Sequence, residues 1–326
     1  MSIEAVKSRI DWAKPYVVPQ MEQTRPPLRS LNVRELLELE IPPREMILNP
    51  ILPEQGLVML YAPRGIGKTH VALWMAYTVA CGDAMFGNKW QCEKPRKVLF
   101  VDGEMPASTL QMRLSSIVAS SEKELEDVDN LKIITPDYQE LGIPDLSTPS
   151  GQEWLEPHLE NTNLLILDNL SSLCRSGREN ESESWNPLQG WLLKLRKAGI
   201  SVLFVHHAGK GGNQRGTSKK EDILDTVIVL RKPNDYDQRE GARFEVHYEK
   251  ARGFYGEEAR PFEAWLKEEE GKMSWQVQEI EDLQFNRLID LHKDGLKQRE
   301  ISKELGLGLG TINRWIKRAK EEGKVQ

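Results

Sequence analysis

The stretch from residue 56 to residue 82, GLVMLYAPRGIGKTHVALWMAYTVACG, determines the fold that we expect for this chain. It begins with a short, continuous apolar run, which is typical of a strand buried on both faces. A glycine-containing loop follows, and then a helical pattern that ends on Gly82, a residue suited to a helix C-terminus. A strand, such a loop and a helix in this order predict an anion-binding turn within an α/β sheet.

The later apolar runs continue this alternation of strand and helix. Strands are expected at residues 97–103, 131–135, 163–173 and 200–208, and helices at residues 107–120 and 191–199. Two further strands, which we expect to be antiparallel, are predicted at residues 226–233 and 243–253, and a closing hairpin at residues 261–278. Alternating strands and helices predict a right-handed, mostly parallel α/β sheet.

Composition excludes several classes of protein. The chain has 326 residues, of which 39% are hydrophobic and 29% charged, and this excludes global disorder. No apolar run approaches the roughly 20 residues that cross a bilayer, and no signal peptide is visible, so we expect no membrane partner. Three cysteines, Cys81, Cys92 and Cys174, fit neither a disulfide nor a metal pattern, and a reducing cytoplasm is the simplest compartment.

The loop at residues 62–69, APRGIGKT, fits the phosphate-loop pattern G-x-x-x-x-G-K-[ST] except that Ala62 replaces the first glycine. An alanine there costs about 1 kcal/mol at positive φ and nothing in the β region. Lys68 is expected to reach the β- and γ-phosphates of ATP, and the Thr69 hydroxyl to hold Mg²⁺. A chance Gly-Lys-Thr is the alternative, which the flanking strand and helix and the internal Gly65 disfavour. The expected nucleotide-contacting residues are Arg64, Gly65, Ile66, Gly67, Lys68, Thr69 and His70.

Two later strands end in acidic residues. Asp168 closes the apolar run LLILD, where a Walker B carboxylate would hold Mg²⁺ through water; an ordinary helix-capping aspartate is the alternative. The run VLFVDGEMP offers Glu104 as the base that orients or deprotonates the attacking water, with Asp102 as the second choice.

The run VLFVDGEMPASTLQMRL resembles the strand, glutamate, Met-Pro and helix of DnaB-type replicative helicases. The order of motifs over about residues 45–278 resembles the RecA-like hexameric helicases, particularly the plasmid RepA-type ATPases. The resemblance implies a RecA-like P-loop NTPase core with a mostly parallel sheet, Glu104 as catalytic base and a homo-oligomer, with a hexamer favoured. It also implies that His207, at the end of the next strand, is a sensor of the γ-phosphate; plain strand-end polarity of His206 and His207 is the alternative.

Two basic segments follow the predicted strand that ends in His206 and His207. The Gly-rich run AGKGGNQRGTSKKED contains Lys210, Arg215, Lys219 and Lys220. The resemblance implies that this loop lines a central channel and contacts single-stranded DNA, with Arg215 near a neighbour's nucleotide; a solvated surface loop is the alternative. Lys250 and Arg252 resemble a Lys-x-Arg of DnaB-like helicases that reaches the γ-phosphate bound to the adjacent subunit. The alternative is a basic pair on the surface of an edge strand.

The C-terminal segment differs from the rest in charge. Residues 283–326 hold 10 Lys and Arg against 6 Asp and Glu, a net +4, while the remainder carries −10 of the total of −6. Apolar positions there resemble a helix-turn-helix of the resolvase or sigma-factor type, a small all-α domain that contacts duplex DNA; a module that contacts protein is the alternative. The expected DNA-contacting residues are Thr311, Asn313, Arg314, Lys317 and Arg318.

These observations predict three regions: an arm or linker at residues 1–45, the ATPase domain at residues 46–278 and the helix-turn-helix at residues 283–326. The first functional hypothesis is a ring-forming, ATP-hydrolysing DNA helicase or translocase of plasmid, phage or mobile-element replication. The alternative is an ATP-switched DNA-binding regulator or helicase loader without unwinding activity, and a recombinase-like filament former is a third. RecA-like folds serve all three, so the fold does not decide.

Overall fold

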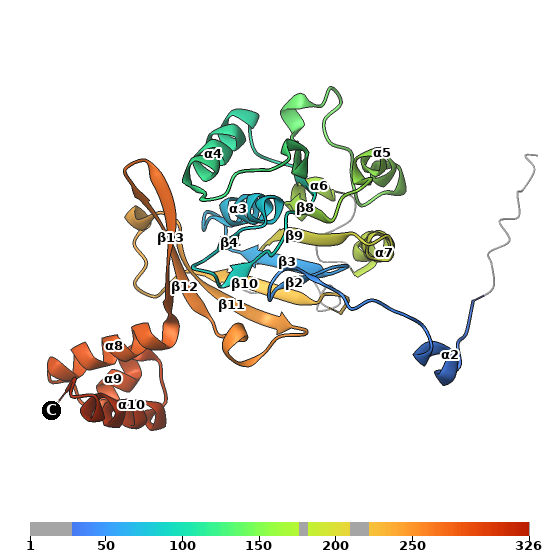
Figure 1. Ribbon diagram of the computed structural model, residues 1–326. Coiled ribbons are helices and arrows are strands. Elements are labelled where there is room, and N and C mark those ends of the chain that lie inside the picture. The colour runs from blue at the N-terminus through green and yellow to red at the C-terminus, as the bar shows by residue number, and fades with distance from the viewer. Residues whose placement is uncertain (1–27, 176–181, 209–221, 326) are drawn as a thin grey trace, which may run out of the picture. The chain divides into compact units, whose positions relative to one another are not determined.

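The computed structural model describes residues 28–175, 182–208 and 222–325 (Figure 1). The chain divides into two compact units, of which the first ends at Pro43 and the second begins at Arg44. The described part of the first unit contains one short helix, α2 (Val33–Leu37), which Asn32 and Glu35 cap reciprocally. Every residue of this helix is exposed to solvent.

The second unit contains a nine-stranded sheet in the order β13-β12-β11-β10-β3-β9-β8-β6-β7. The strands from β10 to β7 in this order are all parallel, and the edge formed by β11, β12 and β13 is antiparallel. The bounds are β3 (Leu57–Ala62), β6 (Val98–Asp102), β7 (Leu131–Ile134), β8 (Leu164–Asp168), β9 (Ser201–His207), β10 (Thr226–Arg231), β11 (Arg243–Ala251), β12 (Phe262–Glu269) and β13 (Lys272–Glu279). The predicted mostly parallel α/β sheet is confirmed, including the antiparallel pair and the final hairpin.

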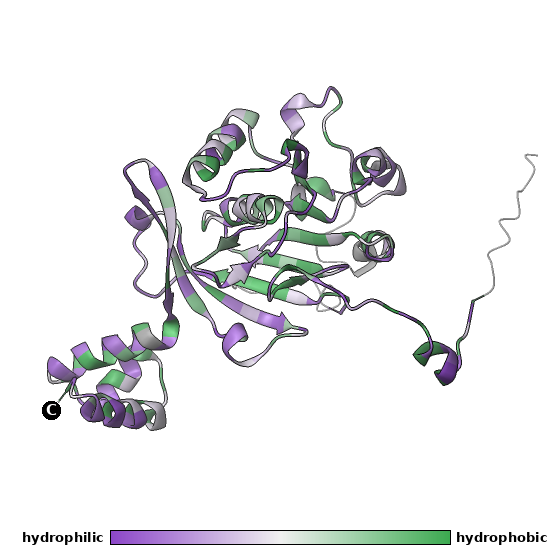
Figure 2. Cartoon of the chain, in the orientation of Figure 1, coloured by the Kyte–Doolittle hydropathy of each residue, from purple (hydrophilic) through white to green (hydrophobic). Residues whose placement is uncertain are grey.

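Helices cover both faces of this sheet, because successive side chains of a buried strand point to opposite sides. Val58 and Leu60 of β3 face one apolar cluster, and Leu57, Met59 and Tyr61 face the other. The central strands are therefore apolar along most of their length, with polar residues only at the ends of β8 and β9 (Figure 2). The covering helices are α3 (Lys68–Cys81) and α4 (Ala107–Ser120) on the first face, and α5 (Pro149–Leu159), α6 (Leu170–Leu173) and α7 (Ser182–Lys197) on the second.

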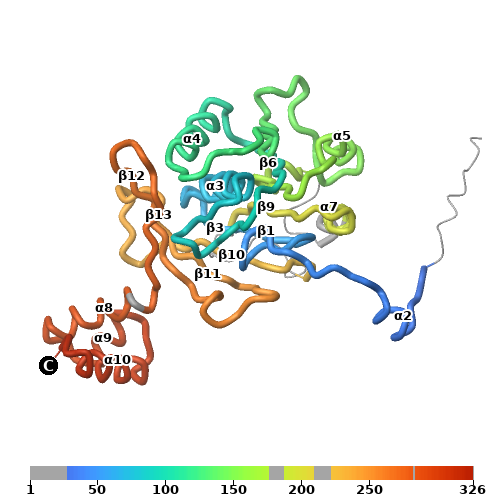
Figure 3. The backbone as a smooth tube through the Cα atoms, in the orientation of Figure 1, coloured from blue at the N-terminus to red at the C-terminus, as the bar shows by residue number. Residues whose placement is uncertain are grey.

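Several short elements connect these layers (Figure 3). Two antiparallel pairs are formed by β1 (Met46–Leu48) with β2 (Leu52–Pro53) and by β4 (Ala84–Met85) with β5 (Trp90–Gln91). Within the described ranges, the 3-10 helices are η1 (Val128–Asn130), η2 (Pro136–Tyr138), η4 (Gln238–Glu240) and η5 (Gly256–Ala259). The sequence predicts neither of these pairs nor α5, which contains Pro157 and buries only one side. The strand predicted at residues 163–173 is too long, because β8 ends at Asp168 and Asn169 caps the helix α6.

The C-terminal helices α8 (Ile280–Lys293), α9 (Gln298–Leu305) and α10 (Leu309–Glu321) have an apolar core of their own. Phe285 and Trp315 meet edge to face in this core, with ring centroids 5.9 Å apart. Gly306 ends α9 at φ 65°, a left-handed conformation that favours glycine. The helices match the predicted helix-turn-helix, and α10 starts two residues before the predicted Thr311 because Gly308 is its N-cap.

None of the helices in the described ranges combines the length and the apolar character that crossing a bilayer requires.

We expect Ile301→Ala to lower the stability of the α8–α10 module by about 2–5 kcal/mol, because the side chain is 0% exposed in the module core. Hydrogen exchange of backbone amides in α8, α9 and α10 measures the loss. Leu309→Ala is the matched control, since that side chain is 44% exposed. Equal protection of the two variants would contradict the proposed core.

Candidate functional site

The phosphate loop joins the central strand β3 to helix α3. Ala62 lies within the extended strand, so replacing the first glycine of the pattern carries no backbone cost there. Gly65 and Gly67 have φ values of 75° and 106°, which side chains rarely adopt. At Gly67 a Cβ atom would also lie 3.4 Å from the Cβ of Ala242. Gly67 thus occupies the second glycine position of the pattern, and Gly65, at a variable position of the pattern, is a further glycine that the loop conformation requires.

The same loop presents backbone donors at the start of α3. Gly67 is the N-cap and has no side chain with which to cap the first-turn N–H groups. These groups and the positive end of the helix dipole form a site for an anion. Ile66 is buried and anchors the loop, whereas Arg64 and Gly65 are exposed. The backbone geometry fits the phosphates of a nucleotide.

Lys68 is buried at 6% exposure, and the loop itself binds its ammonium group. Its Nζ donates to Ala62 O at 3.0 Å and to Pro63 O at 2.8 Å. Burial lowers its pKa to about 8, against the opposing effect of Asp168 and Glu104. These contacts hold a cation beside the anion site, where phosphate oxygens can replace the two carbonyls.

Two buried carboxylates lie side by side at the carboxyl ends of neighbouring strands. Asp102 of β6 pairs in register with Asp168 of β8, and each is 2% exposed. Burial raises the pKa of Asp102 to about 6, although the Met105 N–H donates to its Oδ2 at 2.8 Å. Burial also raises the pKa of Asp168 to about 7, while the Thr69 hydroxyl and Lys68 lower it and Asp102 raises it.

The Asp168 carboxylate fits a hydrated Mg²⁺. Its Oδ2 is buried and, among the described residues, has no hydrogen-bond partner. The neighbouring Thr69 supplies a second oxygen of the kind that Mg²⁺ prefers. In the part of the chain that the structure describes, no group of three His, Cys, Asp or Glu could hold a metal by itself. Mg²⁺ would therefore be shared with nucleotide phosphates, as is usual for this ion.

Glu104 follows β6 and is exposed, but its carboxylate is bound to a residue that the sequence analysis missed. Asn169 Nδ2 donates to Glu104 Oε2 at 2.6 Å, and Asn169 itself is 4% exposed. Asn169 directly follows Asp168, where an asparagine after a strand indicates a helix N-cap. That signal is visible in the sequence, but it does not indicate the contact with Glu104, which lies 65 positions away.

The two strand-end histidines lie beside the phosphate loop. On β9, His206 pairs in register with Tyr61 and His207 with Ala62, the last residue of β3. His206 is buried and His207 is half-buried. The structure thus brings the predicted sensor next to the start of the loop.

The side chain of His70 lies in an aromatic cluster rather than over the phosphate loop. Its ring centroid is 5.8 Å from that of Trp74 and 6.3 Å from that of Trp275. Burial, with a smaller effect of Arg113, lowers its pKa to about 4, so the imidazole is neutral near pH 7. Only the backbone of His70, in the first turn of α3, is available to the predicted phosphate site.

Lys250 and Arg252 lie at the other end of the sheet from the phosphate loop of their own chain. Thr226 pairs with both Ala251 and Val58, so the end of β11 is level with the start of β3. The phosphate loop begins four residues further along β3, on the order of 13 Å away. Both side chains donate to Asp222 O, Lys250 at 3.4 Å and Arg252 at 3.1 Å.

The remaining predicted residues fall into two groups. Lys210, Arg215, Lys219 and Lys220 lie outside the described residues. The other group lies on α10, where Asn313, Arg314, Lys317 and Arg318 are exposed and Thr311 is half-buried.

Arg318 has partners within its own module. Its guanidinium lies 4.4 Å from the ring centroid of Phe285, and its Nε donates to Glu322 Oε1 at 2.7 Å. Asn313, Arg314 and Lys317 therefore form the more accessible part of the predicted recognition face.

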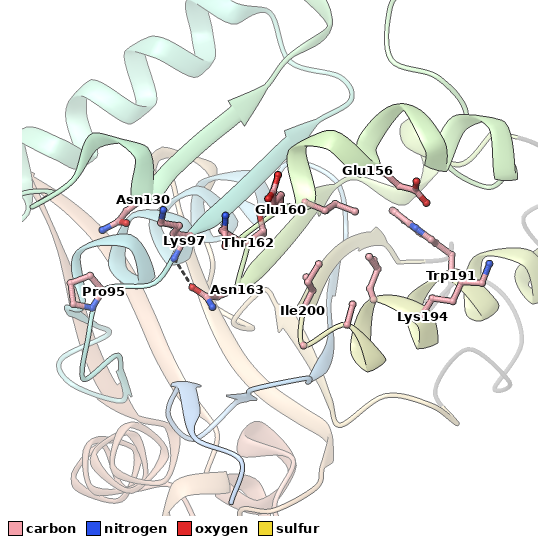
Figure 4. Close-up of a pocket in the computed structure, with 15 residues that line it drawn as sticks. Pro95, Lys97, Asn130, Glu156, Glu160, Thr162, Asn163, Trp191, Lys194 and Ile200 are labelled. Atoms are coloured by element: carbon pink, nitrogen blue, oxygen red, sulfur yellow. Dashed lines mark hydrogen bonds between the residues drawn. The ribbon is translucent and has the colours of Figure 1, made fainter. Parts of the chain in front are cut away.

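A wide cavity of about 890 Å³ lies at the opposite edge from the phosphate loop (Figure 4). Lys97, Asn163 and Ile200, which line it, directly precede β6, β8 and β9. The Lys97 N–H donates to Asn163 Oδ1 at 2.9 Å across one side of it. The groups that can bind a nucleotide, namely the cation, the carboxylates and the helix N-terminus, meet instead at the carboxyl edge.

Comparison with known proteins agrees with this geometry. The family described as an AAA domain matches residues 22–213, and a family described as a homeodomain-like domain matches residues 287–325. A solved KaiC-like protein from the hyperthermophilic archaeon Pyrococcus horikoshii is 19% identical over 69% of this chain and 91% of that chain, with a TM-score of 0.48. The mostly parallel sheet and the match to the AAA domain family show that the core has a P-loop ATPase fold of the RecA-like class, and the second family match shows a helix-turn-helix-like module after it.

The raised pKa values predict a pH-dependent stability in the absence of nucleotide and Mg²⁺. The folded protein binds the Asp102 and Asp168 protons more tightly than the unfolded chain, so this stabilisation is full below about pH 4. It is lost as the pH rises through about 6 and 7. We expect Asp168→Asn to be more stable than the wild type by on the order of 4 kcal/mol at pH 8 and 1.5 kcal/mol at pH 5.

Urea unfolding at the two pH values measures this difference. Asp129→Asn is the control for a change of charge at an exposed position, because its side chain is 68% exposed. A difference between wild type and Asp168→Asn that does not grow from pH 5 to pH 8 would contradict the assignment.

Proposed function

The chain belongs to the AAA domain family, and we propose that it is a ring-forming, ATP-driven DNA helicase or translocase of plasmid, phage or mobile-element replication. The proposal rests on the distance between two groups of residues on one sheet, the phosphate loop and the cations Lys250 and Arg252. The phosphate loop follows the carboxyl end of β3, and Lys250 and Arg252 lie level with its amino end. Such cations can serve a nucleotide only in a neighbouring copy, which is how ring ATPases couple their subunits.

Within one subunit, the loop N–H groups and Lys68 would bind the ATP phosphates. Thr69 and Asp168 would hold Mg²⁺, which would neutralise part of the phosphate charge when bound. Glu104 would accept a proton from the attacking water while the oxygen of that water bonds to the γ-phosphorus. The bond from that phosphorus to the bridging oxygen breaks, and ADP and phosphate leave. His207 would sense the γ-phosphate from β9, beside the loop.

Between subunits, Lys250 and Arg252 would stabilise the charge that develops on the transferred phosphoryl group. Arg215 would act near the same nucleotide, and Lys210, Lys219 and Lys220 would contact single-stranded DNA in a hexameric ring. These assignments follow the resemblance to RepA-type and DnaB-type ATPases.

The C-terminal module would bring the ring to duplex DNA. Support comes from the match of residues 287–325 to a homeodomain-like domain and from the exposed Asn313, Arg314 and Lys317 on α10. Asparagine and arginine suit base edges, and lysine suits phosphates. The same module favours the alternative function, an ATP-switched regulator or loader, so the two are separated by measuring unwinding.

We expect ATP-dependent strand displacement on a forked duplex, with ATP hydrolysis stimulated by single-stranded DNA. Lys68→Ala should abolish both activities, because the variant loses the cation beside the phosphates. Lys132→Ala is the control, since it also removes a lysine cation but its side chain is 60% exposed on the edge strand β7, outside the phosphate loop. DNA-independent hydrolysis without displacement, at concentrations where rings form, would favour the regulator or loader instead.

A mixing experiment tests the shared site. Arg252→Ala and Glu104→Gln subunits should each be nearly inactive, because one lacks the trans cation and the other the base. A mixture should regain part of the ATPase rate, since some interfaces combine an intact Glu104 with an intact Arg252. If hydrolysis in the mixture stays at the level of the separate variants, action in trans is wrong.

A further inference from the structure

Asn169 is held at both ends of its side chain. Its Oδ1 accepts from the N–H groups of Ser171 and Ser172, at 3.0 and 3.3 Å, and so caps helix α6. Its Nδ2 donates to Glu104 Oε2 at 2.6 Å. Because the residue is 4% exposed and its amide is bound at the oxygen, its orientation is fixed before Glu104 is considered.

The backbone brings the two segments together independently of these side chains. The Gly103 N–H donates to Asp168 O at 2.8 Å, which joins the ends of β6 and β8. A Cβ on Gly103 would collide with Ser172 Oγ and would lie 2.8 Å from Leu173 Cδ2. Glycine at this position therefore permits the start of α6 to approach the turn that carries Glu104.

Glu104 is the adaptable partner in this contact. It is exposed and has a long side chain with several rotamers, so an unrestrained carboxylate would sample many positions. Asn169 is the fixed partner, and the direction of its N–H decides where the carboxylate oxygen lies. The amide is neutral, so it orients the carboxylate without forming an ion pair.

We propose that Asn169 is a positioning residue, which orients the Glu104 carboxylate toward the attacking water. The hydrogen bond occupies Oε2 and leaves Oε1 to accept the proton. The inference rests on the proposed function, because it takes Glu104 as the base. Asn169 itself would not touch the reacting atoms.

Two substitutions separate the contact with Glu104 from the capping of α6. Asn169→Ser keeps a good N-cap oxygen but is too short to reach Glu104, and Asn169→Asp keeps the cap but loses the donor. In the full-length protein we expect kcat for ATP hydrolysis to fall about 10- to 100-fold in both variants. KM for ATP and the urea midpoint should stay close to those of the wild type.

The Glu104→Gln background provides the specific readout. There, Asn169→Ser should cause no further loss in single-turnover hydrolysis, because the base that it positions is absent; a merely structural role would lower the rate again. Asn163→Ser, the same chemical change at the opposite edge of the sheet, is the matched control. Wild-type or increased kcat in both Asn169 variants would overturn the proposal, as would a fall in kcat that the Glu104→Gln background does not remove.

The failure of this inference is distinguishable from that of the proposed function. If Glu104→Gln hydrolyses ATP at the wild-type rate, Glu104 is not the base and the proposed mechanism fails. If Glu104→Gln is inactive while Asn169→Ser and Asn169→Asp are fully active, only the positioning role is wrong.

Discussion

The parallel pairing of β3, β9, β8 and β6 is the constraint on which the site depends. It places the carboxyl ends of four strands at one edge, with Ala62 level with His207 and Asp102 level with Asp168. Apolar clusters on both faces hold this register, because a shift by one residue would place each buried side chain in a space that is close-packed around a different one. The same burial places Lys68 and the two aspartates in a medium of low polarity, where their interactions with each other and with bound ions are strong.

The sequence predicts this edge because its signals are local. Continuous apolar runs locate the central strands, and the glycines and lysine of the phosphate loop carry their own backbone requirements. Side-chain contacts between distant segments are not predictable in this way. Asn169 meets Glu104 across 65 positions, and the ring of His70 turns toward Trp275 although its position in the motif suggests a nucleotide contact. The polar helix α5 was missed because Pro157 and Gly151 are poor helix formers, and tertiary packing of its apolar side overrides that preference.

The sheet also keeps the cation of Arg252 away from the phosphate loop of the same subunit. Asp225 fixes the amino end of β3 by accepting the Leu57 N–H at 2.9 Å, and the main-chain N–H of Arg252 donates to Asp225 O at 2.9 Å. Arg252 is thereby tied to the edge opposite its own phosphate loop. A rigid sheet of this kind cannot bring the two together by a loop movement, so a role for Arg252 in hydrolysis requires a second copy of the chain.

The acidic net charge of −6 is a poor guide to what the chain contacts, because it averages regions with different tasks. The basic C-terminal segment follows a strand that packs against a helix of the phosphate-loop region. Trp275 of this strand, β13, contacts the ring of His70 on α3. Helix α8 begins five residues after Trp275, at Ile280. Met273 of the same strand donates its N–H to Ser120 at the end of α4, the helix that follows Glu104. Both helices that leave the nucleotide edge on this face therefore pack against the strand that continues into the basic C-terminal segment.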